Sequence, residues 1–384
     1  MMRNSIVIVI VLFLCSLKVH GEEKLKLDCP RLEPGVVAIR PVELSQPEGL
    51  SLSEDNYPHT SGSTSAEPMG VWIACRLLKR DCRWPDDSTG ERRLLPLRKG
   101  QYRNRSFYKA VDSGFYRKIR HFGTHGSYVK LIKGEVDLIF ECRKPSKDEY
   151  SLMSEESVGL DIKPIALDAF VFLKHKDNPV KNLTLDQIRD IFTHDTKRGG
   201  KIANWKELGG LDKRVTPFIR NRNSGSQETM MSLVMKRRRI VNAGRMVQGK
   251  GMSSPYNMMV VNAFGIGFTF YYYQRYMAPL YEAVGQKSEK QETQKQKKAA
   301  GNTIKMFAVN GVAPSRDTIV DQSYPLVTAV YAVVRKNMRS DHPAVRLRDW
   351  LLTEEGQKII SETGYVPLND AGHESIPEIK GQVE

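Results

Sequence analysis

Residues 220–229 combine the side chains and backbone that a small anion needs in its binding site. The stretch reads RNRNSGSQET, between an apolar run at 215–219 and apolar positions at 230–234. The pattern predicts a strand, a polar turn and then a helix. The first amides of a helix lack intrahelical partners and carry partial positive charge, so such a turn suits a tetrahedral oxyanion. An ordinary serine helix cap beside a solvated arginine is the alternative interpretation.

Two other stretches place glycine and hydroxyl side chains at the start of a predicted helix. They are residues 60–69, TSGSTSAEPM, and residues 122–127, FGTHGS. Singly, each is typical of a helix cap. If the three turns converge, they supply a ring of donors, and each hydrogen bond to a charged group contributes about 1.5–3 kcal/mol.

The elements that must position these turns alternate between strands and helices. Buried strands are predicted at 136–140, 169–173 and 327–334, and a Thr184…Gln187 capping box predicts a helix through 192. Two short helices are expected within 341–361. The alternation predicts an α/β fold with largely parallel sheets, and 384 residues favour two lobes over one core.

Residues 1–21 have the features of a cleavable secretory signal peptide. Arg3 precedes an apolar run at 6–14, and the small residues Val19 and Gly21 stand before the expected cleavage point. The apolar run is too short to span a membrane. The sequence therefore predicts an exported protein.

The cysteines are expected in a compartment that permits disulfides. Cys29, Cys75, Cys82 and Cys142 remain after the signal peptide, and three pairings are open. Cys75 and Cys82 are close enough to join a helix end to the following loop. The spacings match no zinc motif, so no metal site is predicted.

The chain is basic, with a formal net charge of +15. Such a protein attracts anions and its field raises their encounter rate. The basic run at 236–239 and the Lys/Gln-rich stretch at 286–298 are interpreted as solvated surface. No basic motif interleaved with aromatic residues accompanies the charge, so nucleic-acid binding is not predicted.

Several segments, taken in order, resemble the phosphate-binding proteins of ABC-type phosphate uptake, which are type II periplasmic binding proteins. The resemblance runs from about residue 59 to 368 and covers most of the mature chain. Its main segments are SGSTS at 61–65, GEVDLIFECRKPS at 134–146, LDAFVF at 167–172, NWKELGG at 204–210, RNRNSGSQET at 220–229, FGIGF at 264–268 and WLLTEEGQ at 350–357.

The resemblance implies a two-lobed type II periplasmic-binding-protein fold of class α/β. Each lobe would be a mixed, mostly parallel sheet flanked by helices, with a cleft between the lobes. Lobe 1 would comprise residues 22–165 and 325–384, and lobe 2 residues 166–324. The resemblance also implies a monomeric periplasmic or extracellular receptor that captures phosphate for the permease subunits of an ABC transporter, without cofactor, metal or nucleic acid.

The ligand-binding residues of that family map onto the three turns. They correspond to Ser63, Thr64, Ser65, Thr124, Ser127, Arg220, Ser224, Gly225 and Ser226. Three further candidates are His125, Glu141 and Arg222. Arg222 stands where phosphate receptors carry an aspartate that positions the binding arginine. Glu141 and Asp137 are candidates for the carboxylate that accepts a proton from the ligand, and the position of Asp137 at the start of a strand favours Glu141. These departures leave selectivity for phosphate over sulfate open.

Three other functions remain as alternatives. The first is a receptor for another oxyanion such as sulfate. The second is a polyanion-binding or adhesion protein that uses its basic surface. The third is a hydrolase with Ser224 or Ser226 as nucleophile, which is disfavoured because the sequence around Ser226 is not a Gly-x-Ser-x-Gly elbow.

Overall fold

The computed structural model of the protein describes residues 50–83, 94–96, 112–193, 202–236, 238, 240, 247–249, 251–277 and 303–371. All of them belong to the compact unit Leu32–Glu384, and the unit Met1–Arg31 lies outside the described residues. The expected signal peptide, Cys29 and the Lys/Gln-rich stretch at 286–298 also lie outside them. The predictions made for these segments stay predictions.

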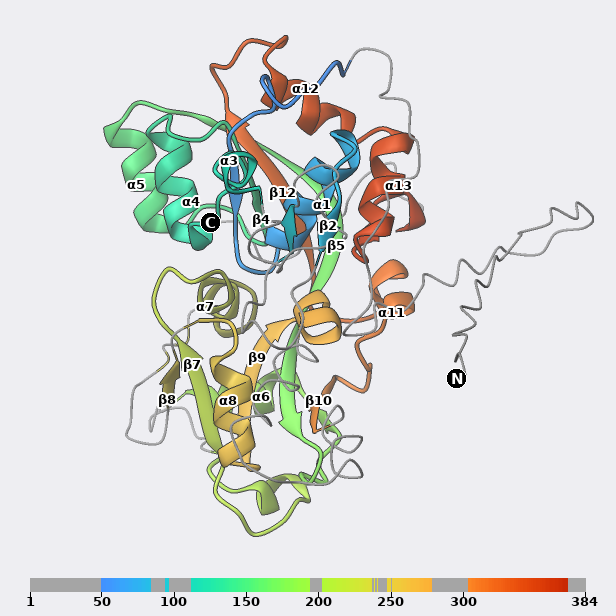
Figure 1. The fold of residues 1–384 in the computed structure, drawn as a ribbon. Coiled ribbons are helices and arrows are strands. Elements are labelled where there is room, and N and C mark those ends of the chain that lie inside the picture. The colour runs from blue at the N-terminus through green and yellow to red at the C-terminus, as the bar shows by residue number, and fades with distance from the viewer. Residues whose placement is uncertain are drawn as a thin grey trace, which may run out of the picture. The chain divides into compact units, whose positions relative to one another are not determined.

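Strands and helices alternate along the chain (Figure 1). The strands are β1 (Thr60–Gly62), β2 (Cys82–Arg83), β3 (Leu95–Pro96), β4 (Leu138–Glu141), β5 (Leu160–His175), β6 (Asn182–Leu183), β7 (Thr216–Arg220), β8 (Val247–Gly249), β9 (Gly265–Phe270), β10 (Ile304–Met306), β11 (Ala308–Val309), β12 (Val327–Arg335) and β13 (Val366–Pro367). The α-helices are α1 (Glu67–Leu77), α3 (Ser113–Tyr116), α4 (Gly123–Ile132), α5 (Lys147–Glu155), α6 (Leu185–Phe192), α7 (Gly225–Thr229), α8 (Ser254–Val261), α11 (Arg316–Val320), α12 (Pro343–Trp350) and α13 (Glu354–Glu362). Short 3-10 or π-helical segments are η1 (Trp205–Leu208), η2 (Met230–Met235), η3 (Tyr273–Met277) and η5 (Asn369–Ala371).

Most strands belong to one mixed sheet with the order β1-β4-β12-β5-β9-β7-β8. The pairings are parallel toward both ends, between β1 and β4 and among β9, β7 and β8. They are antiparallel in the middle, where β12 and β5 lie, and β10 and β13 add to β5 in the same sense. The predicted α/β class, with mixed sheets flanked by helices, is confirmed.

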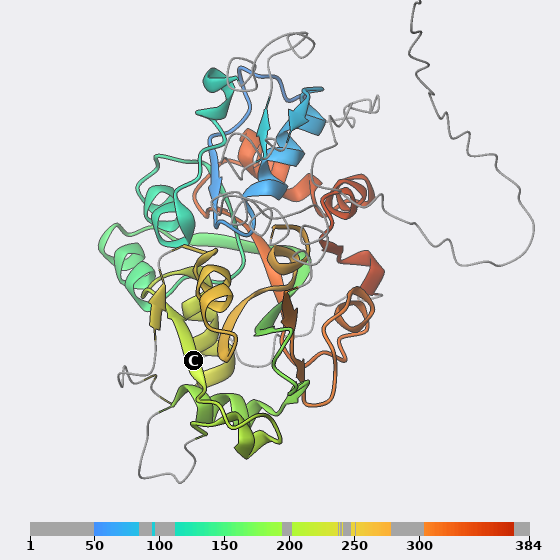
Figure 2. The same cartoon turned by 60° about the horizontal axis from the view of Figure 1, so that its bottom comes forward.

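The long strand β5 connects the two parallel ends of this sheet (Figures 1 and 2). Residues 160–169 pair with β12, and residues 170–173 pair with β9. The sequence predicted only 169–173 because the first part of β5 is half-buried and lacks a continuous apolar run. The lobe boundaries expected from the sequence imply that the chain passes between the lobes near residues 162–173 and 325–334. Both segments fall on the paired strands β5 and β12. The division into lobes remains a prediction.

An aromatic core supports the second parallel end of the sheet. Phe170 of β5 lies 5.4 Å from Phe268 of β9 and 5.7 Å from Phe270, measured between ring centroids. Phe192 of α6 packs 5.8 Å from Phe268. Burial of each such side chain contributes about 1.5–3 kcal/mol, and β7 pairs with β9 next to this core.

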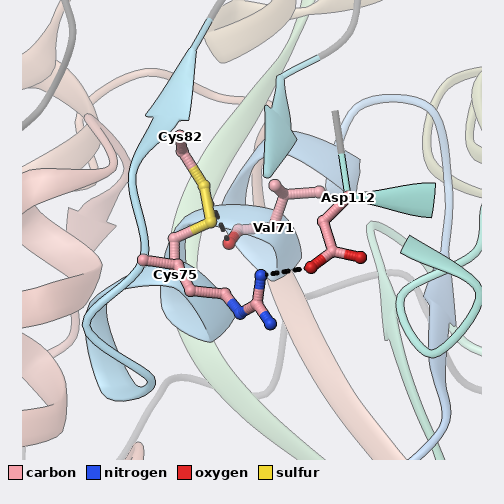
Figure 3. Close-up of a disulfide and its surroundings, with 5 residues drawn as sticks. Val71, Cys75, Cys82 and Asp112 are labelled. Carbon is pink, nitrogen blue, oxygen red and sulfur yellow. Dashed lines mark hydrogen bonds and ion pairs between the residues drawn. A yellow bond between two sulfur atoms is a disulfide. The ribbon is translucent and has the colours of Figure 1, made fainter. Parts of the chain in front are cut away.

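A disulfide joins Cys75 near the end of α1 to Cys82 of β2, with the Cα atoms 6.1 Å apart (Figure 3). Arg80, in the loop closed by this bond, donates to Asp112 at 2.6 Å. The pairing that the sequence favoured by proximity is therefore present. Cys142 is buried and is in no disulfide among the described residues.

Candidate anion-binding site

One pocket of about 350 Å³ brings the three predicted turns together. Its lining comes from the turn after β1, the start of α4, the turn between β7 and α7, and three further residues. The lining residues are Ser63, Thr64, Ser65, Phe122, Gly123, Thr124, His125, Gly126, Arg220, Asn221, Arg222, Asn223, Ser224, Gly225, Ser226, Gly251, Met252 and Phe270. The convergence on which the sequence hypothesis depended is thus observed. That these residues bind an anion stays a prediction.

The turn after β1 is tied to the neighbouring strand β4. The Ser63 amide donates to the Phe140 carbonyl at 3.0 Å. The hydroxyls of Ser63 and Ser65 are 3.2 Å apart, and Ser65 Oγ lies 3.0 Å from Cys142 Sγ, so both are engaged within the protein. Thr64 is less buried, and its Oγ1 is 3.0 Å from a ring nitrogen of His121.

The start of α4 leaves its first amides without a side-chain cap. Gly123 has φ of +69°, a left-handed conformation that a side chain would strain, and it brings the chain into the helix beside the pocket. Thr124 and His125 follow in the lining. The uncapped amides and the positive end of the helix dipole offer hydrogen bonds to an anion here.

Two predicted ligand residues do not line the pocket. Ser127 is fully buried, and its hydroxyl lies 2.8 Å from Ser61 Oγ and donates to the Gly62 carbonyl. It sits three residues beyond Thr124, on the side of α4 that packs against β1. Glu141 ends β4 and is also fully buried, away from the pocket surface.

The turn between β7 and α7 is held by its own side chains. The Arg220 amide donates to Gln227 Oε1 at 2.9 Å, and Ser224 Oγ accepts from the Gln227 amide. Asn223 has φ of +65°, a conformation that asparagine tolerates better than most residues. The predicted serine cap is present, and the turn also faces the shared pocket.

Arg220 is the main electrostatic feature of the pocket. Its side chain is almost fully buried, its Nε has no hydrogen-bond partner, and it forms no ion pair with any described residue. Burial lowers the pKa of Arg220 to about 10. The buried hydroxyl of Ser226 likewise lacks a partner in the described chain. Two pocket-lining donors are therefore left without a partner by the part of the chain that the structure describes.

The turn after β7 touches α4 and α5 directly. A Cβ atom built on Gly225 would lie 2.8 Å from Thr124 Oγ1, so only glycine permits this approach. Asp148 of α5 accepts from Arg222 at 2.8 Å and from the Asn223 side chain at 2.9 Å. Arg222, which departs from the family pattern, thus pairs with a carboxylate across the pocket mouth instead of positioning Arg220.

An ion pair of Arg143 with Glu149 supports the same contact. Both side chains are buried, and the guanidinium donates to both carboxylate oxygens at 2.7 and 2.8 Å. Arg143 also donates to the Asn223 carbonyl at 3.3 Å, while Glu149 lies 3.0 Å from His125 Nδ1. His125 therefore lines the pocket with its ring held by Glu149.

Sequence reasoning missed several of these residues. The turn after β7 is contacted by residues about 75 positions earlier in the chain, namely Asp148 and the ion pair of Arg143 with Glu149. A local sequence pattern cannot predict contacts over such a separation. The one local sign was the Ser146…Glu149 spacing of a capping box, which the structure contains. Phe270 packs in the aromatic core described above and lines the pocket as well.

No cluster of three or more His, Cys, Asp or Glu side chains is arranged to hold a metal ion in the ranges that the structure describes. No helix in the same ranges has the length and apolarity needed to cross a bilayer.

The chain matches the PBP superfamily domain over residues 112–352. The phosphate-binding protein PstS of Pseudomonas aeruginosa is 26% identical over 274 residues, which cover 68% of this chain and 77% of that protein. PstS of Bacillus subtilis is 23% identical over 228 residues, which cover 57% of this chain and 63% of the relative.

Solved structures are similar at the level of the fold. A substrate-binding protein from Clostridium perfringens, solved with bound phosphate, superposes with a TM-score of 0.54 at 21% identity. The alignment covers 82% of this chain and all of that one.

Proposed function

Because the chain belongs to the PBP superfamily and has the type II periplasmic-binding-protein fold, we propose that its pocket binds one phosphate-like tetrahedral oxyanion. The observation that carries the proposal is the unpaired, buried guanidinium of Arg220 among hydroxyls and helix amides. The names of the relatives support phosphate as the ion.

A buried cation without a counter-charge is costly, since it has lost its hydration and gained nothing in return. An oxyanion beside Arg220 would restore the lost interactions and also accept from Ser226, whose hydroxyl is unsatisfied. The uncapped start of α4 would add backbone donors. Each charge-assisted hydrogen bond contributes about 1.5–3 kcal/mol, so a few reach micromolar affinity.

The proposed ligand residues are those of the three turns that the pocket displays. They are Ser63, Thr64, Ser65, Thr124, Arg220, Ser224, Gly225 and Ser226, with His125 and Arg222 at the mouth. Ser127 and Glu141 are left out because neither lines the pocket.

Sulfate is a second candidate ligand, favoured by one observation. No aspartate or glutamate occurs among the described residues of the lining, so no carboxylate there repels a fully ionised anion or accepts a hydrogen bond from a protonated one. Comparing phosphate with sulfate is therefore part of any test.

We further propose that the protein is an exported receptor for an ABC importer. Residues 22–165 with 325–384 would form one lobe and residues 166–324 the other. Binding would hold together turns from both lobes, as ligand-driven closure requires. Catalysis is not proposed, because the Ser226 hydroxyl has no base beside it among the described residues and Ser224 caps its helix.

Titration calorimetry of the mature protein with phosphate and with sulfate tests the proposal. We expect Arg220→Ala to weaken phosphate binding by at least roughly tenfold, since it removes one or more charge-assisted hydrogen bonds. Arg339→Ala, which removes an exposed arginine paired with Asp341, should leave the affinity unchanged. An Arg220→Ala protein that melts like wild type and binds phosphate equally well would refute the assignment.

A further inference from the structure

His121 contacts one of the proposed ligand residues from outside the pocket. It lies between α3 and α4, directly before Phe122 of the lining, and is partly buried. Its Nε2 atom is 3.0 Å from the Oγ1 atom of Thr64, which lines the pocket. His121 itself is not a lining residue, and the proposed ligand set gives its ring no role.

The backbone just before His121 is held against β1. The Thr60 amide donates to the Lys118 carbonyl at 2.6 Å, and Thr60 forms a parallel bridge with Ile119, which is buried. Thr60 begins β1, and Thr64 lies in the turn that follows this strand. These anchors bring the two side chains together although 57 positions separate them in the sequence.

Thr64 differs from the two other hydroxyl residues of its turn. Ser63 Oγ and Ser65 Oγ lie 3.2 Å apart, and they are 3.7 and 3.0 Å from the buried Sγ atom of Cys142. Those two hydroxyls are therefore engaged with each other and with the thiol. Thr64 is less buried than either serine, and its Oγ1 contacts a histidine ring nitrogen instead.

The direction of the hydrogen bond between Thr64 and His121 decides what the Thr64 hydroxyl offers an anion. A hydroxyl has one proton, and a histidine nitrogen donates when it carries a proton and accepts when it does not. If Thr64 donates to Nε2, its lone pairs are left for the pocket, where they repel an anion. If Nε2 donates to Thr64 Oγ1, the hydroxyl proton is left for the ligand. An oxyanion, whose oxygens are acceptors, favours the second arrangement.

We propose that His121, with a proton on Nε2, donates to Thr64 Oγ1 and so directs the Thr64 hydroxyl proton toward the bound oxyanion. This inference rests on the proposed function. His121 is then a positioning residue that acts through Thr64 and does not touch the ligand. The neutral ring protonated on Nε2 and the imidazolium both meet the requirement. The arrangement serves any oxyanion oxygen, so it strengthens binding of phosphate and sulfate alike.

The first test compares His121→Gln with His121→Phe by titration calorimetry with inorganic phosphate near pH 7. Glutamine keeps an N–H donor near the place of Nε2, so the affinity should stay within about twofold of wild type. Phenylalanine keeps a ring without a donor, and the affinity should fall roughly fivefold, as for loss of one hydrogen bond. His59→Phe, the same change at an exposed position outside the lining, is the matched control and should have no effect. Wild-type affinity in the His121→Phe variant, or an equal loss in both His121 variants, would overturn the inference.

A double-mutant cycle shows whether the effect passes through Thr64. In a Thr64→Val background, which removes the hydroxyl but keeps the shape, His121→Phe should change phosphate affinity by less than about twofold. An undiminished effect there would mean that His121 acts by another route, and the inference would fail.

Nitrogen-15 NMR of histidine-labelled protein reads the proton position directly and does not depend on the phenylalanine variant folding. The ring signals of His121 are those that the His121→Gln variant lacks. In wild type saturated with phosphate, Nε2 of His121 should carry a proton. Phosphate binding by wild type with an unprotonated Nε2 would refute this inference alone. Failure of wild type to bind either anion would instead refute the proposed function, so the two failures are distinguishable.

Discussion

Asp168 is a buried carboxyl group in the middle of β5, outside the pocket. Its Oδ1 accepts from the amides of Ala169 and Tyr272 at 2.8 and 3.0 Å, and its Oδ2 has no partner among the described residues. Tyr272 stacks on Tyr365, whose hydroxyl donates to the Ser65 carbonyl. A charge on Asp168 would therefore lie beneath the turn that carries Ser65.

Burial raises the pKa of Asp168 to about 7, and its two backbone hydrogen bonds limit the rise. The folded protein then binds more protons than the unfolded chain between about pH 4 and pH 7, so stability from this group falls as pH rises through that window. We expect Asp168→Asn, which keeps the acceptor oxygen, to gain stability relative to wild type with rising pH. The gain in the free energy of unfolding is at most about 1.4 kcal/mol for each unit by which the pKa of Asp168 differs between the folded and unfolded states. Urea unfolding near pH 5 and pH 8 measures it.

Asp321→Asn is the control for this pH effect. Asp321 is exposed, and its contacts with Ser323 lower its pKa. Its replacement should cause only a small change of the opposite sign. A stability difference between Asp168→Asn and wild type that is the same at both pH values would contradict the assignment.

Single residues were predictable where local turn chemistry decides their place. Ser224 caps its helix as its spacing to Gln227 indicates, and Thr124 opens α4 as the FGTHGS string suggests. Glu141 was a candidate from the sequence but does not line the pocket; all four residues of β4 are buried, so no alternation in the sequence shows which way each side chain points. Ser127 failed because tertiary packing decides it: Ser127 lies one turn further into α4 than Thr124, and its hydroxyl is taken up by Ser61 and the Gly62 carbonyl of β1.

Elements were predicted well where periodicity or caps are strong. The Thr184…Gln187 capping box and the two short helices α12 and α13 are confirmed. The full length of β5 was missed because its first five residues are only half-buried. Sheet order was not readable, since pairing between β12 and β5 joins segments more than 150 residues apart.

The contact between α5 and the turn after β7 joins two elements at the pocket. Asp148 in the first turn of α5 holds both Arg222 and Asn223, and the helix carries Glu149, the partner of Arg143. Exposed ion pairs contribute little by themselves, typically below about 1 kcal/mol. The buried Arg143–Glu149 pair should therefore stabilise this contact more than the exposed Arg222–Asp148 pair does.

We expect Asp148→Ala to weaken phosphate binding roughly three- to tenfold, because the turn loses two hydrogen bonds that hold it at the pocket mouth. Arg222→Ala should have a smaller effect, since the bond from Asn223 to Asp148 remains. Asp341→Ala, which breaks an exposed pair with Arg339, is the matched control in calorimetry. An Asp148→Ala protein with wild-type affinity would show that the turn is positioned without α5.

At the scale of the whole molecule, two sources of attraction for anions must be separated. The net charge of +15 produces a general field, which salt screens within about 10 Å at 0.1 M. The pocket instead offers buried contacts around Arg220, which salt screens far less. A receptor for a small anion and a binder of polyanions therefore differ in their response to ionic strength.

The last prediction uses thermal unfolding at about 0.05 and 0.5 M NaCl, where surface fields are weakly and strongly screened. A ligand at about 100 times its Kd stabilises the folded state by about 2.7 kcal/mol, which for a chain of this size raises the Tm by about 3–4 °C. We expect phosphate to produce this rise at both salt concentrations and Arg220→Ala to abolish it. A sulfated polymer should shift the Tm only at low salt, and with equal size in the Arg220→Ala variant. If instead the polymer stabilises strongly and phosphate does nothing, the basic surface rather than the pocket is the binding site.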